Sequence, residues 1–393
     1  MTGTVDAEVV CLGESMVTFL PSRPGPLADV PSFDRTIGGA ESNVACALAA
    51  AGHRVRWVSR VGADGFGDHL VRSVAAYGVD TSGVRRDPHR PTGIYFRTAT
   101  DRATDAHEVV YYRAGSAASA MSPDNMAPED LRSGALLHLS GITAALSDDC
   151  LALMRALTAR TPGRPLVSFD VNHRPNLWRD PSGVRVLLDL ARGADLVFVG
   201  EDEAAAAWDL HGAEAIRAAL PEPRTLVIKR GAAGATVYTR EPETTTPLGT
   251  APAPPAAPTA SAPSATSAYG RDSAHGREAE CGREAEYGRE AEYGRDTVVS
   301  VPALRVDVVA PVGAGDAFAA GFLSATLRGL PAAARLRHGH LMAAAALTVP
   351  GDLGAPPARA DADRLAGLDA RAWGRLRLGP GWTEATEQEV RTP

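Results

Sequence analysis

Four consecutive residues, Gly313-Ala314-Gly315-Asp316, combine an anion-binding backbone with a carboxylate. The two glycines let the backbone turn tightly and present successive N–H groups, and the positive end of a following helix adds to them. Asp316 would then accept a proton from an attacking hydroxyl while the amides stabilise charge on a phosphoryl group. The pattern favours phosphoryl transfer. An ordinary tight turn, with Asp316 capping the helix, fits the same residues.

A second glycine pair, Gly38-Gly39, precedes Asn43 at the start of another expected helix. The glycines permit close backbone approach to a ligand, and the Asn43 amide can both donate to and accept from sugar hydroxyls. These residues suit a polyol as ligand. A glycine turn followed by a helix-capping residue has the same pattern.

Tyrosines and arginines gather on segments expected to face a small ligand. Tyr95 lies on one candidate strand, Tyr111 and Arg113 lie on the next, and Arg174 follows a buried strand. A planar guanidinium pairs well with a carboxylate or phosphate, and open α/β sheets bind ligands at the carboxyl ends of their strands. Arg113 and Arg174 are therefore candidate anion clamps. The alternative is that the tyrosines pack a small sheet and the arginines are solvated.

Candidate nucleotide contacts follow other expected strands. Lys229, the single lysine of the chain, is followed by Gly231-Ala232-Ala233-Gly234-Ala235, whose amides can approach phosphates, although a hairpin turn would look the same. Asn172 belongs to a polar cluster after a buried strand and is a further candidate. Glu203 can reach a magnesium ion through water, or it is an ordinary acid of a first helical turn.

The elements that must position these residues alternate between strand and helix. Strands are expected at 55–61, 135–139, 166–170, 195–199 and 225–229, with helices at 66–77, 151–159, 183–191 and 203–210. This alternation predicts an α/β fold of three layers, with a mostly parallel sheet covered on both faces. A further strand is expected at 304–309, before Gly313. Additional strands at about 15–20, 93–99 and 108–113 predict a small β lid, and residues 1–393 are expected to form a single domain.

Residues 241–297 interrupt the alternation. A tract rich in Pro, Ala, Thr and Ser leads into three similar hexads that begin at Gly276, Gly282 and Gly288. The segment has too few aliphatic residues to offset the entropy of ordering, so it is predicted to be a low-complexity, disordered insertion. Its flanks, 235–240 and 297–302, are expected to pair as a hairpin, where a long loop costs little stability. A repeat that docks a partner is the alternative.

Composition narrows the function further. The net charge of −7 falls mostly within 241–297, so the rest of the chain is nearly neutral and a nucleic-acid partner is not expected. Four widely spaced cysteines argue against a disulfide framework and a structural zinc site, and favour a cytoplasmic location. No apolar stretch approaches the ~18 residues of a membrane span, and no leader pattern is seen, so neither a membrane span nor a signal peptide is expected.

Taken in this order, the motifs resemble those of the ribokinase-like (PfkB-type) carbohydrate kinases over nearly the whole chain except the insertion. Gly38 to Ala45, running on through Gly62, is similar to the first signature of that family. Gly313 to Phe318 is similar to the second, in which the aspartate is the catalytic base and the preceding amides form the anion hole. The resemblance implies a ribokinase-like fold with ATP and Mg²⁺ as cofactors. Lids in such folds often pair across a dimer, although the sequence itself does not specify an oligomeric state.

Within that family, several segments look like those of 2-keto-3-deoxygluconate kinases. They are the strand with Tyr95, 110–117, 138–142, 170–174 and 351–356. The resemblance implies substrate contacts at Gly38, Gly39, Tyr95, Tyr111, Arg113, Arg174, Asp316 and Asp352, and ATP contacts at Gly231 to Ala235 and Gly313 to Gly315. Two positions depart from the family pattern: Ala310 stands where relatives commonly have an acid, and Gly200 stands where an asparagine precedes Glu203 in the magnesium motif.

The expected activity is ATP-dependent phosphorylation of the terminal C6 hydroxyl of 2-keto-3-deoxygluconate. Arginines on both ligand-facing elements match the carboxylate of a sugar acid, whereas a neutral hexose would leave them unpaired. A fructokinase or other neutral-sugar kinase of the same fold is one alternative. A catalytically silent, sugar-binding regulatory protein, consistent with Ala310 and Gly200, is another.

Overall fold

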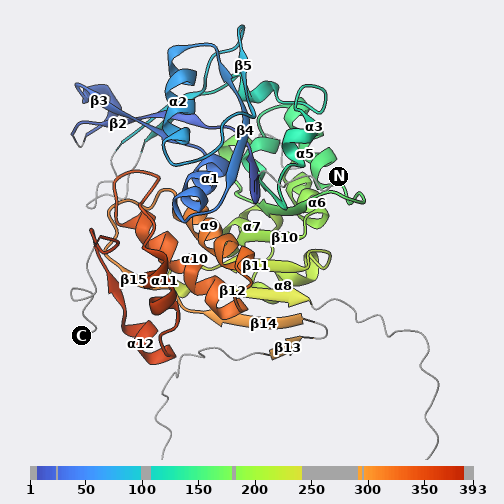
Figure 1. Cartoon of the computed structure of the whole chain (residues 1–393), viewed down its shortest axis with the longest axis vertical. Helices are drawn as coiled ribbons and strands as arrows, with labels where there is room; N and C mark the ends of the chain where they lie inside the picture. The colour runs from blue at the N-terminus through green and yellow to red at the C-terminus, as the bar shows by residue number, and fades with distance from the viewer. Residues whose placement is uncertain are drawn as a thin grey trace, which may run out of the picture.

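Runs of buried apolar residues form a ten-stranded central sheet (Figure 1). The computed structural model describes residues 7–23, 25–98, 108–178, 183–240, 291–293 and 296–384. The sheet has the order β13-β14-β12-β11-β10-β9-β8-β1-β4-β5, and it is parallel from β11 to β5 and antiparallel from β11 to β13. Its strands are β1 (Val9–Leu12), β4 (Val55–Gly62), β5 (Val84–Asp87), β8 (Leu136–Ser140), β9 (Leu166–Asp170), β10 (Leu196–Gly200), β11 (Thr225–Lys229), β12 (Ala235–Arg240), β13 (Ala291–Tyr293) and β14 (Asp296–Val301).

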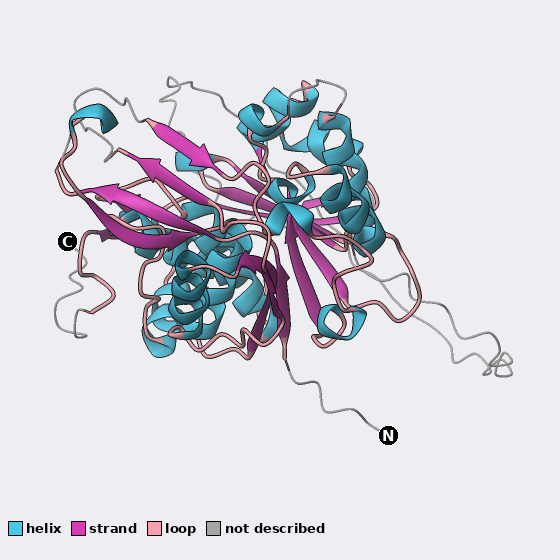
Figure 2. Cartoon of the chain, turned by 90° about the horizontal axis from the view of Figure 1, so that it is seen from above, coloured by secondary structure: helices cyan, strands magenta, loops and turns pink. Residues whose placement is uncertain are grey.

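Helices cover both faces of this sheet, as the view from above shows (Figure 2). Side chains alternate along each strand, so Phe198 packs into one apolar core while its neighbours Val197 and Val199 pack into the other. The first core is shared by α1 (Ala40–Ala50), α2 (Gly65–Ala75), α9 (Ala314–Leu327), α10 (Ala332–Leu347), α11 (Arg359–Ala366) and α12 (Ala370–Arg375). The second is shared by α3 (Pro128–Leu131), α4 (Gly141–Ala144), α5 (Asp148–Thr158), α6 (Val184–Gly193), α7 (Glu201–Trp208) and α8 (Ala213–Ala219).

The three-layer α/β fold expected from the alternation is therefore confirmed. The described residues also form short 3-10 turns: η1 (Leu27–Asp29), η2 (Ala118–Ala120), η3 (Pro175–Leu177) and η4 (Gly231–Ala233). Of the helices in the described ranges, none combines the length and the apolar character needed to cross a bilayer.

A separate four-stranded sheet forms the lid. Its order is β3-β2-β6-β7, and β2 and β3 extend away from the central sheet in Figure 1. The strands are β2 (Met16–Pro21), β3 (Phe33–Gly38), β6 (Ile94–Arg97) and β7 (Val109–Tyr112). Aromatic rings join them, because Phe19 stacks on Phe96 with 4.7 Å between ring centroids and Phe33 meets Phe96 edge to face. β2, β6 and β7 match the expected lid strands. β3 was not expected, because charged residues such as Asp34 and Arg35 hide its strand pattern.

Two sequence-based predictions are wrong in part. The run 304–309 does not join the central sheet: only β15 (Arg305–Val306) forms there, and it pairs with β16 (Arg377–Leu378). Pro302, directly after β14, has no N–H to continue a ladder. Of the expected insertion 241–297, residues 241–290 and 294–295 lie outside the described residues, but β13 and the start of β14 fall within it.

A buried ion pair anchors the first residue of β14, Asp296. The buried carboxylate of Asp296 accepts hydrogen bonds from Arg217 at 2.6 and 2.9 Å, in a bidentate arrangement. The hairpin expected at the flanks is confirmed, because β12 pairs antiparallel with β14 from Ala235↔Val301 to Arg240↔Asp296.

Candidate active site

The turn before α9 is built around Gly313. This residue has φ +73°, and a Cβ placed on it would lie 2.1 Å from the carbonyl oxygen of Asp352, so only glycine fits. No side chain caps the N-terminus of α9, which begins at Ala314. The amides of the first helical turn therefore keep their donor capacity for an outside acceptor, as an anion hole requires. The turn and helix start predicted from the sequence are both present.

Asp316 lies in this first turn and faces α1. The amide Nδ2 of Asn43 donates a hydrogen bond of 2.9 Å to Asp316 Oδ2, so the two glycine motifs meet although 273 residues separate them. Within the described structure, the other amide atom, Asn43 Oδ1, is buried with no hydrogen-bond partner and remains able to accept one from a ligand hydroxyl. Asn43 thus holds the candidate base and can also accept a hydrogen bond from a ligand, a double role that the sequence did not reveal.

Burial raises the pKa of the Asp316 carboxyl to about 7. The hydrogen bond from Asn43 opposes this rise in pKa, and the nearby carboxylate of Asp170 adds to it. A carboxyl that titrates near neutral pH is a better proton acceptor than an ordinary aspartate and is still ionised in a large fraction of molecules.

The pH dependence of the reaction should report this pKa. Because only the ionised Asp316 can accept a proton, kcat/KM should rise with pH, about tenfold per unit below 7, and level off above it. Initial rates between pH 5 and 9, with both substrates well below KM, measure the profile. A flat profile from pH 5 to 7 would contradict the assignment.

Lys229 brings a positive charge to the same turn. Its Nζ donates to both carboxylate oxygens of Asp170, at 3.0 and 2.9 Å, and would lie 3.7 Å from a Cβ built on Gly315. Burial lowers the pKa of this ammonium, but the carboxylates of Asp170 and Glu203 outweigh it and leave the pKa raised. The ammonium therefore stays protonated beside the candidate anion hole. Asn172, two residues beyond Asp170, is buried at φ +42°.

Glu203 is the candidate magnesium contact. Its Oε2 accepts a 2.7 Å hydrogen bond from the N–H of Gly200, and its Oε1 lies 3.8 Å from Arg174, whose side chain is 55% exposed. Among the residues that the structure describes, no three His, Cys, Asp or Glu side chains gather as a metal cluster. Nucleotide-bound Mg²⁺ needs only one or two protein carboxylates, with phosphates and water completing its coordination. Glu203 can provide one such carboxylate.

The lid supplies a network around Gly38. Tyr95 donates from its hydroxyl to Asp352 Oδ2 at 3.0 Å, and Arg97 donates to Asp352 Oδ1 at 3.2 Å. A Cβ on Gly38 would lie 2.3 Å from the Tyr95 hydroxyl oxygen, and one on Gly39 would lie 2.4 Å from a backbone carbonyl. Both oxygens of Asp352, a predicted substrate contact, are thus already engaged by the lid. The sequence did not predict Arg97 as a site residue, because its role depends on a partner, Asp352, that is 255 residues away in the chain.

Arg113 also has a protein partner. Its guanidinium forms a buried ion pair with Glu14, and Glu14 in turn accepts a 2.6 Å hydrogen bond from Ser116. Arg113 also lies over the ring of Tyr111, 5.7 Å from the ring centroid, and Tyr111 itself is exposed at the lid. Arg113 is therefore a partly neutralised cation and not an unpaired anion clamp. Glu14 was not among the predicted site residues. Its position directly after the turn at Gly13, at the end of a buried strand, is the signal that could have identified it.

The expected nucleotide loop forms the turn between β11 and β12. Gly231 and Gly234 adopt φ +52° and +117°, and the N–H of Arg230 donates to the carbonyl of Gly234 at 2.8 Å. Ala232 and Ala233 are exposed, whereas the side chain of Ala235 is buried in β12. The segment is thus a hairpin turn, and it begins directly after Lys229 at the carboxyl end of β11.

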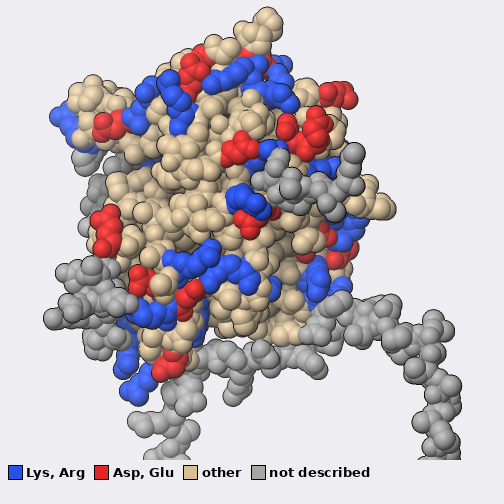
Figure 3. Space-filling model, in the orientation of Figure 1, with Lys and Arg blue, Asp and Glu red and all other residues tan. Residues whose placement is uncertain are grey.

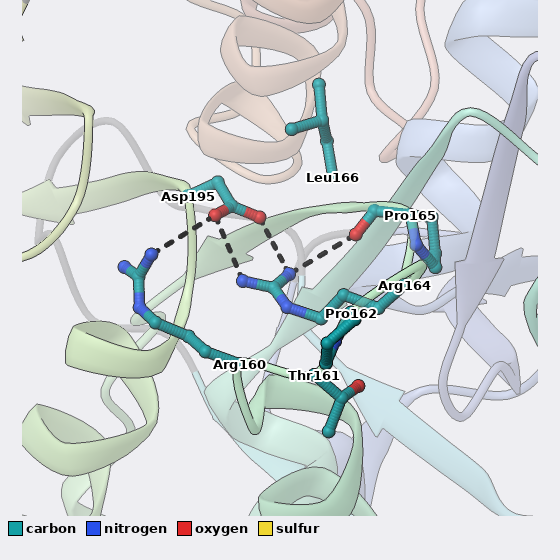
Figure 4. A pocket seen from close by; sticks show the side chains of 7 residues that line it. All are labelled: Arg160, Thr161, Pro162, Arg164, Pro165, Leu166 and Asp195. Atoms are coloured by element: carbon teal, nitrogen blue, oxygen red, sulfur yellow. Dashed lines mark hydrogen bonds and ion pairs between the residues drawn. The ribbon is translucent and has the colours of Figure 1, made fainter. Parts of the chain in front are cut away.

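A hollow lies near the amino-terminal end of the parallel strands, opposite the candidate site. It has a volume of about 360 Å³ and lies next to Leu166, the first residue of β9 (Figure 4). Arg160 and Arg164 line it, and both turn toward the carboxylate of Asp195, at 3.4 and 2.7 Å. Asp195 offsets one of these two positive charges, and Arg160 and Arg164 also donate to the backbone carbonyls of Ala194 and Gly193, so their donors are engaged within the protein and the hollow is not a comparable site. On the face shown in Figure 3, basic and acidic side chains are interspersed.

Comparisons with known proteins agree with this geometry. A family model described as pfkB family carbohydrate kinase matches residues 6–261 and 289–359. A 2-dehydro-3-deoxygluconokinase of Thermoproteus tenax is 35% identical over 234 residues, which are 58% of this chain and 71% of that protein. A 2-dehydro-3-deoxygluconokinase of Bacillus subtilis (strain 168) is 37% identical over 201 residues, and the match spans 49% of this chain and 60% of the Bacillus protein. Fructokinases also match, such as fructokinase-1 of Zea mays, which is 30% identical over 59% of this chain and 73% of that protein.

Solved structures share the fold over nearly the whole chain. A PfkB protein from Polaromonas sp. JS666 superposes with a TM-score of 0.68 and 30% identity, over 91% of this chain and 99% of that one. A fructokinase with bound ATP from Xylella fastidiosa superposes with a TM-score of 0.67, over 91% of this chain and 98% of that one. At 21% identity, the Xylella structure supports the fold alone.

Proposed function

The chain belongs to the pfkB family of carbohydrate kinases, and from that membership we propose that it transfers the γ-phosphoryl group of ATP to the C6 hydroxyl of 2-keto-3-deoxygluconate. The contact between Asn43 and Asp316 carries the proposal, because it joins the candidate sugar motif to the candidate base. An ATP-consumption assay with a panel of sugars and sugar acids tests it directly. Turnover with 2-keto-3-deoxygluconate is the expected result, and turnover with neutral hexoses alone would contradict the substrate.

The reaction needs a proton acceptor, a place for negative charge and a way to align two ligands. Asp316 takes the proton as the C6 oxygen attacks phosphorus and the bond from the γ-phosphorus to the leaving ADP oxygen breaks. The N–H groups at the start of α9 and the ammonium of Lys229 stabilise the charge on the migrating group. Asn43 positions both Asp316 and the sugar, so that the oxygen and phosphorus approach in line.

ATP and magnesium are part of the proposal. The turn from Gly231 to Gly234, exposed at residues 231–233, and the start of α9 would contact the nucleotide, together with Asn172 and Lys229. Glu203 would hold a nucleotide-bound magnesium ion through water, and that ion would offset charge on the ATP phosphates. Gly200, in place of an asparagine, leaves Glu203 as the residue of that motif able to do so.

The choice of a sugar acid rests on two observations. The two relatives with the highest identities quoted above are both named 2-dehydro-3-deoxygluconokinase. Arg174 is an exposed guanidinium near the base, and its distant contact with Glu203 leaves it free to pair with a substrate carboxylate. Fructokinases among the relatives keep a neutral-sugar kinase as the alternative.

Replacing Arg174 by glutamine should distinguish these two substrates. A hydrogen bond to a charged group contributes about 1.5–3 kcal/mol, so kcat/KM for 2-keto-3-deoxygluconate should fall roughly 10- to 150-fold. Any activity on fructose should change less than about threefold. Steady-state kinetics with both substrates measure the difference, and an equal loss on both would favour the neutral-sugar alternative.

Arg113→Gln is the informative companion variant. Since Arg113 already pairs with Glu14, its loss would leave Glu14 as a buried carboxylate near the sugar. A substrate carboxylate would then be repelled, and activity on the acid should fall at least as much as in Arg174→Gln.

The homo-oligomer and the cytoplasmic location remain predictions. The lid edge strand β7 exposes Tyr111 and Tyr112, which a second lid would bury in a homo-oligomer. The cytoplasmic location is consistent with three buried free thiols in the described residues, at Cys11, Cys46 and Cys150.

A further inference from the structure

The loop after α10 touches both the lid and the turn that begins α9. Its residue Asp352 is buried, and its side chain accepts hydrogen bonds from Tyr95 and Arg97 on the lid strand β6. The backbone carbonyl of the same residue lies against Gly313, at the place where a Cβ would be 2.1 Å away. One residue thus contacts the lid through its side chain and the candidate anion hole through its backbone.

Arg97 donates two hydrogen bonds to this loop, whereas Tyr95 donates one. Its Nη2 donates to Asp352 Oδ1 at 3.2 Å and also to the backbone carbonyl of Pro350 at 2.9 Å. The side chain is buried, and its Nε has no hydrogen-bond partner in the described structure. A buried ion pair of this kind adds little net stability, because desolvation offsets the attraction between the charges. Because the Arg97–Asp352 pair adds little stability, its role is better explained by the positioning of the loop that contains Asp352.

We propose that Arg97 is a positioning residue for phosphoryl transfer. By fixing Pro350 and Asp352, it sets the loop that supports Gly313, and thereby the direction in which the first amides of α9 point. An anion hole stabilises charge only if its donors are already aimed at the place where charge develops, and small displacements cost much of the rate. The inference rests on the proposed phosphoryl transfer and adds a residue that never touches either ligand.

Kinetics of Arg97→Gln test the proposal. We expect kcat to fall roughly 10- to 100-fold while the KM for ATP stays within about twofold, because the amides move but the nucleotide still binds. Arg97→Lys, which can still donate to one of the two acceptors, should recover part of the loss. If Asp352 acted only as a substrate contact, Arg97→Gln would instead raise the KM for the sugar and leave kcat unchanged.

Arg217→Gln is the matched control. It removes another buried arginine–aspartate pair, Arg217 with Asp296, which lies near the β13 edge of the central sheet and away from the lid. Both glutamine variants should melt at lower temperature, but only Arg97→Gln should lose turnover per folded molecule. Equal melting losses with wild-type kcat in both variants would overturn the positioning role.

Amide hydrogen exchange gives a readout that does not depend on the substrate. In Arg97→Gln without ligands, peptides covering 313–316 and 350–352 should exchange faster than in the wild type, whereas Arg217→Gln should leave them unchanged. Unchanged exchange in those peptides of Arg97→Gln would overturn the proposal whatever the sugar is. If the wild type phosphorylates another sugar of the panel, the kinetics use that sugar, so an error in the substrate and an error in this inference give different results.

Discussion

Asp316→Asn should lower kcat by roughly 10²- to 10⁴-fold while leaving the fold and the affinity for both ligands nearly unchanged. Asparagine has the size of aspartate and can still accept a hydrogen bond from Asn43, but its amide oxygen cannot take the proton of the attacking hydroxyl. The loss should therefore appear in the chemical step. ADP release in a coupled assay gives kcat, and calorimetric titration with ATP and with the sugar gives the two affinities.

Two comparisons make this experiment decisive. Asp209→Asn changes an almost fully exposed aspartate in the same way and should keep wild-type rates. The small remaining activity of Asp316→Asn should also lose the rise in kcat/KM toward pH 7, since the group that titrates there is gone. Near-normal turnover in Asp316→Asn would remove the general-base assignment.

Lys229→Met should damage both turnover and stability. The ammonium is the only partner that the described structure shows for the buried carboxylate of Asp170, and breaking one side of a buried pair costs about 3–5 kcal/mol. The same change removes a positive charge next to Gly315, so kcat/KM for ATP should fall by about 10²-fold or more, in the range found for lost transition-state donors. Urea unfolding and steady-state kinetics measure the two effects separately.

Lys229→Arg separates charge from shape. It keeps the charge for Asp170 and should restore most of the stability, but the planar fork is bulkier than an ammonium and should not restore the rate. Arg328→Met serves as the control for stability, because its pair with the half-exposed Asp363 should cost only about 0–1 kcal/mol. Wild-type stability and turnover in Lys229→Met would show that the cluster has no role in either.

The sequence was sufficient to predict those parts of the site that are formed by residues adjacent in the chain. The glycine turn before Asp316 and the strand that ends at Lys229 were predicted because turn chemistry and apolar runs are local signals. The mostly parallel sheet followed from the alternation of elements. The same local signals also led to a wrong prediction. The run 304–309 has the composition of a strand, but only Arg305–Val306 pairs, and its partner is the two-residue strand Arg377–Leu378.

The pairs that complete the site could not be predicted in this way. Asn43 meets Asp316 across 273 residues, and Arg97 meets Asp352 across 255. Glu14 meets Arg113 across the lid. No periodicity or spacing specifies such contacts, because they arise when separate elements pack. The sequence therefore showed which residue types lie at the site. It did not show which of them pair with one another, and so it did not show which charges remain available to a substrate.

Lysine-selective isotope labelling would place a label at one side chain in this chain, since all other basic residues except histidine are arginines. That side chain is Lys229, whose ammonium lies over Gly315. A magnetic resonance spectrum of the labelled protein would thus hold a single lysine signal that needs no assignment. Its position would follow nucleotide arrival, phosphoryl transfer and product departure from inside the site.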